Sequence, residues 1–343
     1  MTNKLRFWTD PHLGLNRTAH TTPTSRKNLR EALFQKSLEA VDTPHPNFCL
    51  GDLFDTCNND EYTIMQGAQI ANRCYYVLAG NHDMSNRDSA VSSLEVVAAL
   101  GKVALQPLRM VVGGMAVVMV PHFKTQAEFE ATLKEEVEVE VARSAAYQRV
   151  LLLHCNYGCP HELTDSTLNL TREMALQLLD GPFDYILIGH EHNARSDFGG
   201  RLQILGNIHP TSFSDISDKF VWELEDETLT PIKVWDKETG YLELTPRQVK
   251  DKMYDASVPY QFIKVTGIVP GAELPDVCRA INALWTAFPS ALMIRNDVRA
   301  EEVVLDNSIE IAKAVDIPSR ITQELQGSIL LPRWNAYLAQ VGE

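Results

Sequence analysis

The sequence lacks an apolar run long enough to cross a membrane. Its longest apolar stretch, residues 110–120, is far shorter than the ~20 residues that a membrane helix needs, and glycines at 113 and 114 interrupt it. The N-terminus also lacks the apolar core and small-residue cleavage site of a secretory signal. These absences predict an intracellular, cytoplasmic protein that is not bound to a membrane.

Cysteine pairs with the spacing of metal sites or disulfide frameworks are missing too. The six cysteines include no C-x-x-C pair, so we expect reduced and mostly buried thiols.

Basic charge is scarce, because 31 Lys and Arg stand against 45 Asp and Glu, a formal net charge of −14. A chain this acidic does not bind nucleic acid by broad neutralisation of phosphates, so any DNA contact has to be local. Part of the acidic excess lies in residues 128–140, where we expect one solvated helix face.

What the sequence does contain is an alternation of short apolar segments with longer helix-like stretches. Strands are predicted at residues 4–8, 47–50, 75–78, 149–153 and 184–188. Helices are predicted around residues 25–40, 61–73 and 171–179. A hairpin at 109–120 and strands at 202–205, 220–224 and 229–235 follow without intervening helices. This order predicts an α/β fold, a two-sheet mixed β-sandwich flanked by helices.

The pattern changes near residue 240. Beyond it we predict a strand at 261–265, a helix at 274–285 and a strand at 291–295, then an acidic stretch and a helix-like tail. We therefore expect a main domain over residues 1–240 and, over 241–343, a small α/β cap with a C-terminal extension.

Five short motifs of metal-binding residues follow the predicted strands. They are Asp10-Pro11-His12, Gly51-Asp52-Leu53-Phe54-Asp55, Gly80-Asn81-His82-Asp83, His154 and Gly189-His190-Glu191-His192. Strand ends converge on one edge of an α/β sheet, which is where sites form, and the glycines permit tight turns before the ligands. We therefore expect the five motifs to lie together.

The residue types in these motifs point to a pair of metal ions. Carboxylate oxygens, an amide oxygen and imidazoles suit Mn²⁺, Fe²⁺ or Zn²⁺. Two ions about 3.5–4 Å apart can clamp the attacking and the leaving oxygen of a phosphoryl displacement. The motifs thus predict a two-metal phosphoesterase, with Asp52 as the carboxylate that bridges the ions.

Three further residues are weaker candidates. We expect Asp55 to contact a ligand rather than a metal. His122 follows a predicted strand, and we interpret it as a structural residue. His209 either supports the site from outside or lies on the surface.

Together these motifs resemble the calcineurin-like metallophosphoesterase superfamily, over residues 4 to about 236. Within it, the chain is similar to the nuclease subunit of the SbcCD type, the bacterial and phage relative of the meiotic-recombination nuclease. The similarity rests on the amino-acid sequence of residues 51–55, on the segment 205–215 and on the cap-like C-terminal region.

The resemblance implies two groups of metal ligands bridged by Asp52. The first group is Asp10, His12 and His192, and the second is Asn81, His154 and His190. His82 matches the position that contacts the scissile phosphate and assists the leaving group, and Asp83 would orient its imidazole.

The resemblance also implies cofactors, substrate and partners. The cofactors are two divalent ions, Mn²⁺ first, with Mg²⁺, Fe²⁺ or Zn²⁺ as alternatives. The activity is exonuclease action on duplex ends and endonuclease action on single strands or hairpins, in DNA repair and recombination. The chain is expected to form a homodimer and to bind an SbcC-type coiled-coil ATPase through its C-terminal extension, in a bacterium or a phage-infected host. Candidate DNA contacts are Arg17, Arg26, Lys27, Arg30 and Arg87, although solvated surface is the favoured interpretation of each of them singly.

Two other functions remain open from the sequence. A small-substrate phosphodiesterase or protein phosphatase shares the metal cage, and the acidic charge favours it, whereas the extra C-terminal unit does not. A regulatory subunit with a structural metal cage predicts lost ligands, but all seven proposed ligands are present.

Overall fold

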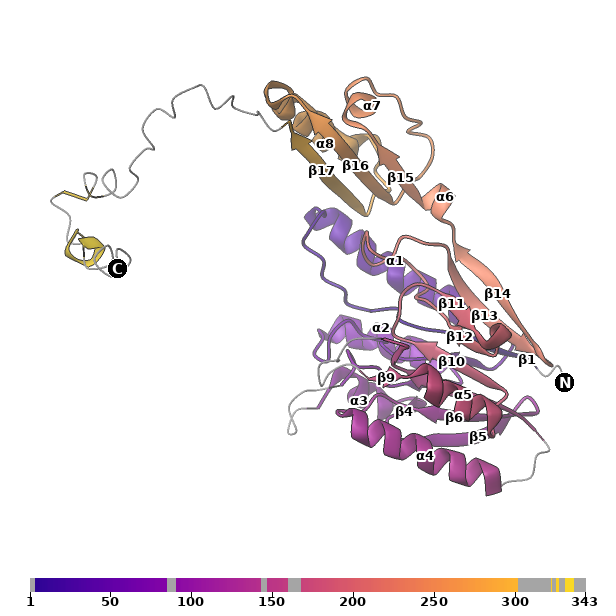
Figure 1. Cartoon of the computed structure of the whole chain (residues 1–343). Helices are drawn as coiled ribbons and strands as arrows, with labels where there is room; N and C mark the ends of the chain where they lie inside the picture. Colours follow the sequence, from indigo (N-terminus) through magenta and orange to yellow (C-terminus); the bar gives the residue numbers. More distant parts are fainter. Residues whose placement is uncertain are drawn as a thin grey trace.

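The computed structural model describes residues 4–84, 91–142, 147–159, 168–301, 322, 325–326 and 331–335. Two six-stranded mixed sheets form the body of the molecule (Figure 1). A third, smaller sheet follows them in the sequence. The predicted mixed two-sheet α/β fold is confirmed.

The first sheet has the strand order β14-β13-β1-β2-β3-β4. Its strands are β1 (Lys4–Trp8), β2 (Asn47–Cys49), β3 (Tyr76–Leu78), β4 (Val103–Ala104), β13 (Lys219–Glu225) and β14 (Thr228–Trp235). Strands β1 to β4 are parallel, and β13 and β14 add an antiparallel edge.

The second sheet has the order β11-β12-β10-β7-β6-β5. Its strands are β5 (Leu108–Val112), β6 (Met115–Val120), β7 (Gln148–His154), β10 (Tyr185–Gly189), β11 (Arg195–Asp197) and β12 (Leu202–Ile204). The central four are parallel, while β5 and β11 are antiparallel edges. A two-stranded ladder of β8 (Asn156–Tyr157) and β9 (Asn169–Leu170) follows β7 in the chain.

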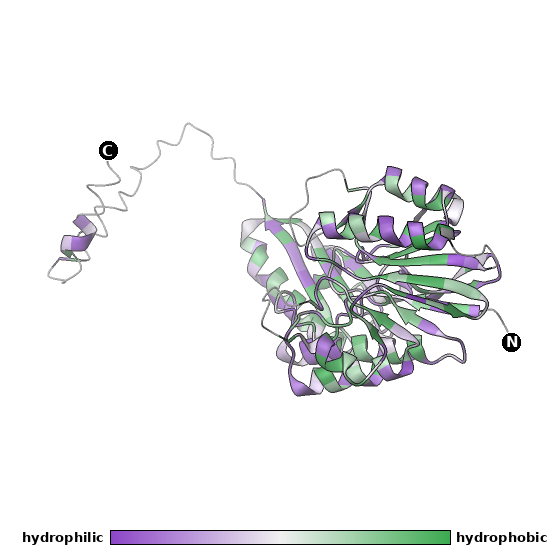
Figure 2. Ribbon diagram, turned by 90° about the horizontal axis from the view of Figure 1, so that it is seen from below, coloured by the Kyte–Doolittle hydropathy of each residue, from purple (hydrophilic) through white to green (hydrophobic). Residues whose placement is uncertain are grey.

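The two sheets bury a shared apolar core, and helices cover their outer faces. Strand β7 illustrates why its sequence is a continuous apolar run: Val150 and Leu152 pack between the sheets, whereas Leu151 and Leu153 pack under the helices on the other face. The covering helices are α1 (Pro23–Val41), α2 (Glu61–Arg73) and α3 (Ser93–Ala98) on the first sheet, with α4 (Gln126–Ala142) and α5 (Arg172–Asp180) on the second. Figure 2 shows the resulting pattern, in which the strands are largely hydrophobic and the helices that cover them carry both hydrophobic and hydrophilic residues.

Helix α4 differs from the expectation of a fully solvated acidic face. The side chains of Glu136 and Glu140 are buried, with 2% and 1% of their surface exposed. Each carboxylate pairs with an arginine from the sheet below, Glu136 with Arg109 and Glu140 with Arg149. The expectation is wrong at these two positions because arginines of β5 and β7 pair with the glutamates, and the charge pattern of the helix alone does not reveal them.

Residues beyond 240 build the third sheet. Its parallel strands β15 (Tyr241–Leu244), β16 (Phe262–Val269) and β17 (Met293–Ala300) pack against α8 (Leu274–Ala287) and the short α7 (Pro246–Lys250), with α6 (Lys237–Gly240) as the connection. Phe262 and Met293 also pack against Leu29 and Leu33 of α1, so this unit lies beside α1 (Figure 1). The boundary at residue 240 stays a prediction, and most of the predicted C-terminal extension lies outside the described residues.

Two further predictions concern the cysteines and membrane-spanning helices. Cys49, Cys74 and Cys155 are buried, and all six cysteines are free thiols. Within the described part of the chain, no helix combines the length and the apolar character required to span a bilayer.

Candidate metal centre

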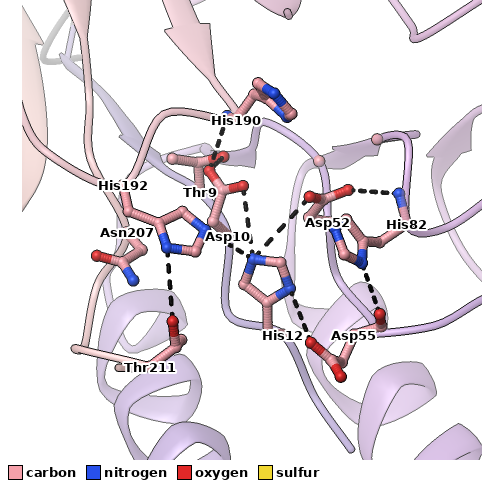
Figure 3. A network of polar contacts seen from close by, with 12 residues as sticks. Thr9, Asp10, His12, Asp52, Asp55, His82, His190, His192, Asn207 and Thr211 are labelled. Atoms are coloured by element: carbon pink, nitrogen blue, oxygen red, sulfur yellow. Dashed lines mark hydrogen bonds and ion pairs between the residues drawn. The ribbon is translucent and has the colours of Figure 1, made fainter. Parts of the chain in front are cut away.

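The proposed ligands lie at the carboxyl ends of neighbouring parallel strands. Asp10 and His12 follow β1, Asp52 follows β2 and Asn81 follows β3, all in the first sheet. His154 ends β7, and His190 and His192 follow β10, in the second sheet. The carboxyl ends of these strands meet, so five segments far apart in the sequence bring the seven proposed ligands together. Figure 3 labels Asp10, His12, Asp52, His190 and His192 among them.

The backbone is strained at several of these residues. Asp10, His12, Asp52 and His190 have φ angles of 55°, 47°, 49° and 88°. This left-handed region is uncommon for residues other than glycine. Such strain gathers at functional sites, where surrounding structure enforces it. Four of the seven proposed ligands therefore sit in conformations that the fold imposes.

Two glycines allow the ligand segments to approach each other. Gly51 has a φ of 105°, and a Cβ there would lie 2.3 Å from Nδ1 of His154. A Cβ on Gly189 would lie 2.4 Å from Oγ1 of Thr9. Any side chain at either position would push the strand ends apart, so both glycines allow close approach, and Gly51 also adopts a left-handed turn conformation.

The first half-site consists of Asp10, His12 and His192. The Nε2 atoms of His12 and His192 lie 3.0 Å apart, and Oδ1 of Asp10 is 3.9 Å from Nε2 of His12 (Figure 3). Oδ2 of Asp10 accepts hydrogen bonds from the Thr9 hydroxyl at 2.6 Å and from the His190 backbone N–H at 3.0 Å. Oδ1 of Asp10 is buried and has no hydrogen-bond partner.

The second half-site consists of Asn81, His154 and His190. Oδ1 of Asn81 lies 3.0 Å from Nε2 of His154 and 2.9 Å from Nδ1 of His190. Nδ1 of His154 donates to the Leu50 carbonyl at 2.7 Å, so the lone pair of the neutral ring is at Nε2.

Asp52 lies between the two half-sites and is 1% exposed. Its Oδ1 is 3.3 Å from Nε2 of His154, and its Oδ2 is 4.0 Å from Nε2 of His12. One carboxylate oxygen thus faces each half-site, which is the arrangement that a bridging ligand requires. The bridging role itself remains a prediction.

The donor set fits divalent cations. An unpartnered carboxylate oxygen, an amide oxygen and imidazole lone pairs converge in a buried space, where they would repel one another without a positive charge. Burial lowers the pKa of His154, but the Asp52 carboxylate, together with Asp10 and the Leu50 carbonyl, outweighs burial and raises the pKa to about 9. The pKa of His12 rises to about 9 in the same way, against burial, through Asp55, Asp52 and Asp10. The site therefore attracts positive charge.

His82 lies at the exposed rim of the site. Its Nδ1 donates to the Asp55 carbonyl at 2.6 Å, and its ring packs edge-on against the His12 ring at 5.1 Å (Figure 3). The Asp55 carboxylate lies 3.5 Å from Nδ1 of His12, and its role beside a ligand rather than on a metal stays a prediction.

The expectation that Asp83 orients His82 is wrong. Asp83 is buried, and its carboxylate accepts hydrogen bonds from the backbone N–H groups of Leu53, Phe54 and Gly80. The turn directs Asp83 inward and His82 outward, so Asp83 joins two ligand loops. The ring of His82 is oriented by the Asp55 carbonyl instead.

Asp215 is a site residue that the sequence analysis missed. It is 2% exposed, and its Oδ2 lies 3.2 Å from Nδ1 of His192. The same carboxylate accepts from the Asn207 amide at 2.8 Å and from the Thr211 backbone N–H at 2.9 Å. Burial would raise its pKa, but the His192 and Thr211 hydrogen bonds hold it well below the usual range. An ionised Asp215 accepts a hydrogen bond from the Nδ1–H of His192, which keeps the lone pair of the neutral ring at Nε2, where it can bind a metal.

The two weaker histidine candidates occupy different places. His209 is fully buried, where Nδ1 donates to the Pro210 carbonyl and Nε2 lies 3.2 Å from the Gln261 side chain. Neither expected alternative holds, because the ring joins the core beside β16. His122 is 6% exposed and packs with its ring 6.4 Å from that of His154. Its structural role stays a prediction.

The predicted DNA contacts differ in how free they are. Arg17 and Lys27 are exposed. Nε of Arg26 donates to the Arg17 carbonyl, and Arg30 donates to Asp60 and Thr63. Arg87 lies outside the described residues.

Residues 7–194, more than half of the chain, match the calcineurin-like phosphoesterase family. The chain belongs to this family. Family membership makes it a metal-dependent hydrolase of the phosphoesterase class, and the two half-sites are candidate positions for the family's divalent metals.

The similar solved structures share little sequence identity with this phosphoesterase. The phosphopantetheinyl hydrolase of Mycobacterium tuberculosis is 14% identical, with a TM-score of 0.38 over 60% of this chain and 89% of that one. A predicted phosphoesterase of Streptococcus pneumoniae is 10% identical, with a TM-score of 0.32 over 69% and 91%. Zinc-complexed Vps29 of Entamoeba histolytica is 10% identical, with a TM-score of 0.29 over 67% and 98%. Likenesses this distant do not define a substrate, and no curated protein sequence matches the chain.

Proposed function

We propose that this phosphoesterase is a DNA nuclease, the subunit of an SbcCD-type repair and recombination complex that cleaves phosphodiester bonds with two divalent ions, Mn²⁺ first. The observation that carries the proposal is the contact between Asp215 and His192. Asp215 ends the segment 205–215, one of the features in which the sequence resembles the nuclease branch, and this segment contacts a proposed metal ligand directly.

The residues of the chain divide the work. Divalent ions in the two half-sites would neutralise phosphate charge and lower the pKa of bound water. One ion would be held by Asp10, His12 and His192. The other would be held by Asn81, His154 and His190, and Asp52 would contact both ions. His82 keeps Nδ1 on the Asp55 carbonyl, so a proton at its exposed Nε2 can pass to the departing 3′ oxygen.

The partners of the nuclease are part of the proposal. Exposed apolar side chains on the neighbouring helices α2 and α3 supply a surface for a homodimer: Tyr62 is 62%, Met65 70% and Leu100, just beyond α3, 66% exposed. Exposed Arg17 and Lys27, which follow the first ligand motif, supply local positive charge for DNA. The coiled-coil ATPase would bind the C-terminal extension.

A small-substrate phosphodiesterase is the second candidate, favoured by the net charge of −14. A single assay separates the two functions. Purified protein is incubated in Mn²⁺ with linear duplex DNA, hairpin DNA and bis-p-nitrophenyl phosphate, beside an Asp52→Ala control. We expect DNA cleavage that disappears in the control. Hydrolysis of the small diester without DNA cleavage, also in the presence of the ATPase partner, would move the function to the second candidate.

A further inference from the structure

Glu191 stands between the ligands His190 and His192 and turns away from them to a cluster of its own. Oε1 of Glu191 accepts the backbone N–H of Tyr157 at 2.8 Å. Both its oxygens receive the guanidinium of Arg195, with Nε to Oε2 at 3.0 Å and Nη2 to Oε1 at 2.8 Å. This paired geometry is the strongest and most directional form of an arginine–carboxylate contact.

Arg195 also grips Tyr157 directly. Its Nη2 donates to the Tyr157 carbonyl at 2.6 Å, and its guanidinium lies 5.1 Å from the centre of the Tyr157 ring. The tyrosine hydroxyl donates to Asp197 at 2.6 Å, which anchors its far end. The backbone of Tyr157 is therefore held at both its polar groups, the N–H by Glu191 and the carbonyl by Arg195.

The cluster joins the two segments that carry the histidines of the second half-site. Tyr157 lies three residues beyond His154, where the chain leaves β7, and Glu191 directly follows His190, where the chain leaves β10. His154 has its own support in the Leu50 carbonyl. For His190, the hydrogen-bond partners found among the described residues are Asn81, at the ring, and Asp10, at the backbone N–H, and its ring also packs against that of His154. Support for its loop from outside the site comes from Glu191.

We propose that Arg195, acting through Glu191 and Tyr157, is a positioning residue for the second half-site. It fixes the distance between the segments that carry His154 and His190, so that both rings face Asn81. The first half-site does not depend on it, since His192 is fixed separately by Asp215. Loss of Arg195 is thus expected to weaken one metal position selectively.

Metal titration of the whole chain tests the proposal without any substrate. Mn²⁺ binding is measured by calorimetry, and the exchange-coupled pair of ions is followed by electron paramagnetic resonance. In Arg195→Ala we expect one ion to bind as in the wild type and the other about 10–100-fold more weakly, the usual effect of losing a contact behind a ligand. The coupled-pair signal should fall accordingly. Arg195→Lys keeps the charge but not the two-pronged contact, so an intermediate loss is expected.

Arg247→Ala is the matched control. Arg247 also pairs with a carboxylate four residues away, Asp251, and its side chain is 86% exposed. Glu191→Gln is the second variant, which retains the shape of the cluster and carries the test if Arg195→Ala does not fold. The proposal is overturned if the arginine variant binds both ions like Arg247→Ala, or if both ions weaken equally. Because no DNA is present, either result is independent of the nuclease assay.

Discussion

The two halves of the metal centre are supported in different ways. Behind the first half-site stands Asp215, 2% exposed and satisfied by buried hydrogen bonds. Behind the second stand a backbone carbonyl and an ion pair whose side chains, Glu191 and Arg195, are 24% and 47% exposed. A buried charge whose partner is removed costs far more than an exposed pair that water already screens. We therefore expect loss of the residue behind the first half-site to reduce stability as well as metal affinity. Loss of the exposed pair behind the second should reduce metal affinity with little effect on stability.

Asp52→Ala should have the largest effect because it removes the residue that both half-sites share. We expect Mn²⁺ affinity to fall at both positions by more than the about 10–100-fold typical of contacts behind a ligand, and phosphodiester hydrolysis to fall to background. Calorimetry and a diester assay measure the two quantities. An Asp52→Ala protein that kept one ion at wild-type affinity would show that the halves are not bridged by this carboxylate.

His82→Ala should separate chemistry from metal binding. The ring contacts the Asp55 carbonyl and the edge of His12, but it lies at the exposed rim. We expect both ions to bind as in the wild type, while turnover falls by about 10²–10⁴-fold, the usual contribution of a general acid or base. The fall should appear in kcat more than in KM. Loss of an ion instead would make His82 a ligand, in line with its closeness to His12 and Asp55.

Asp215→Asn tests how strongly metal affinity and stability depend on the buried contact behind the first half-site. The amide keeps the size of the side chain but presents N–H groups to donors such as the Thr211 backbone N–H. We expect about 10–100-fold weaker binding of one ion, and a loss of about 1–3 kcal/mol in unfolding free energy from the buried donors left unpaired. Urea unfolding with and without Mn²⁺ measures both. A metal loss equal to that of Glu191→Gln, with unchanged stability, would remove the contrast between the halves.

The sequence was sufficient to predict that the proposed ligands lie together because their signal is local. Each one follows an apolar strand, and the carboxyl ends of parallel strands meet whatever the loops do. Asp215 has no such signal, since it acts through a loop that folds back on His192 from about twenty residues away along the chain. The role of Asp83 depended on which way one turn points, and the burial of Glu136 depended on an arginine from β5. Contacts between segments distant in sequence decide all three, and residue spacing does not encode them.

Tyr157→Phe is the mildest change and sharpens the account of the second half-site. The variant removes the hydroxyl that donates to Asp197, but it keeps the ring beneath Arg195 and the backbone groups that Glu191 and Arg195 bind. A hydrogen bond of this kind contributes about 0.5–1.5 kcal/mol, so unfolding free energy should fall within that range. Mn²⁺ affinity should stay within a few-fold of the wild type at both positions, in contrast to Arg195→Ala. If Tyr157→Phe weakened one ion as strongly as Arg195→Ala, the hydroxyl and Asp197 would be what positions His190, and the Glu191 contacts would be secondary.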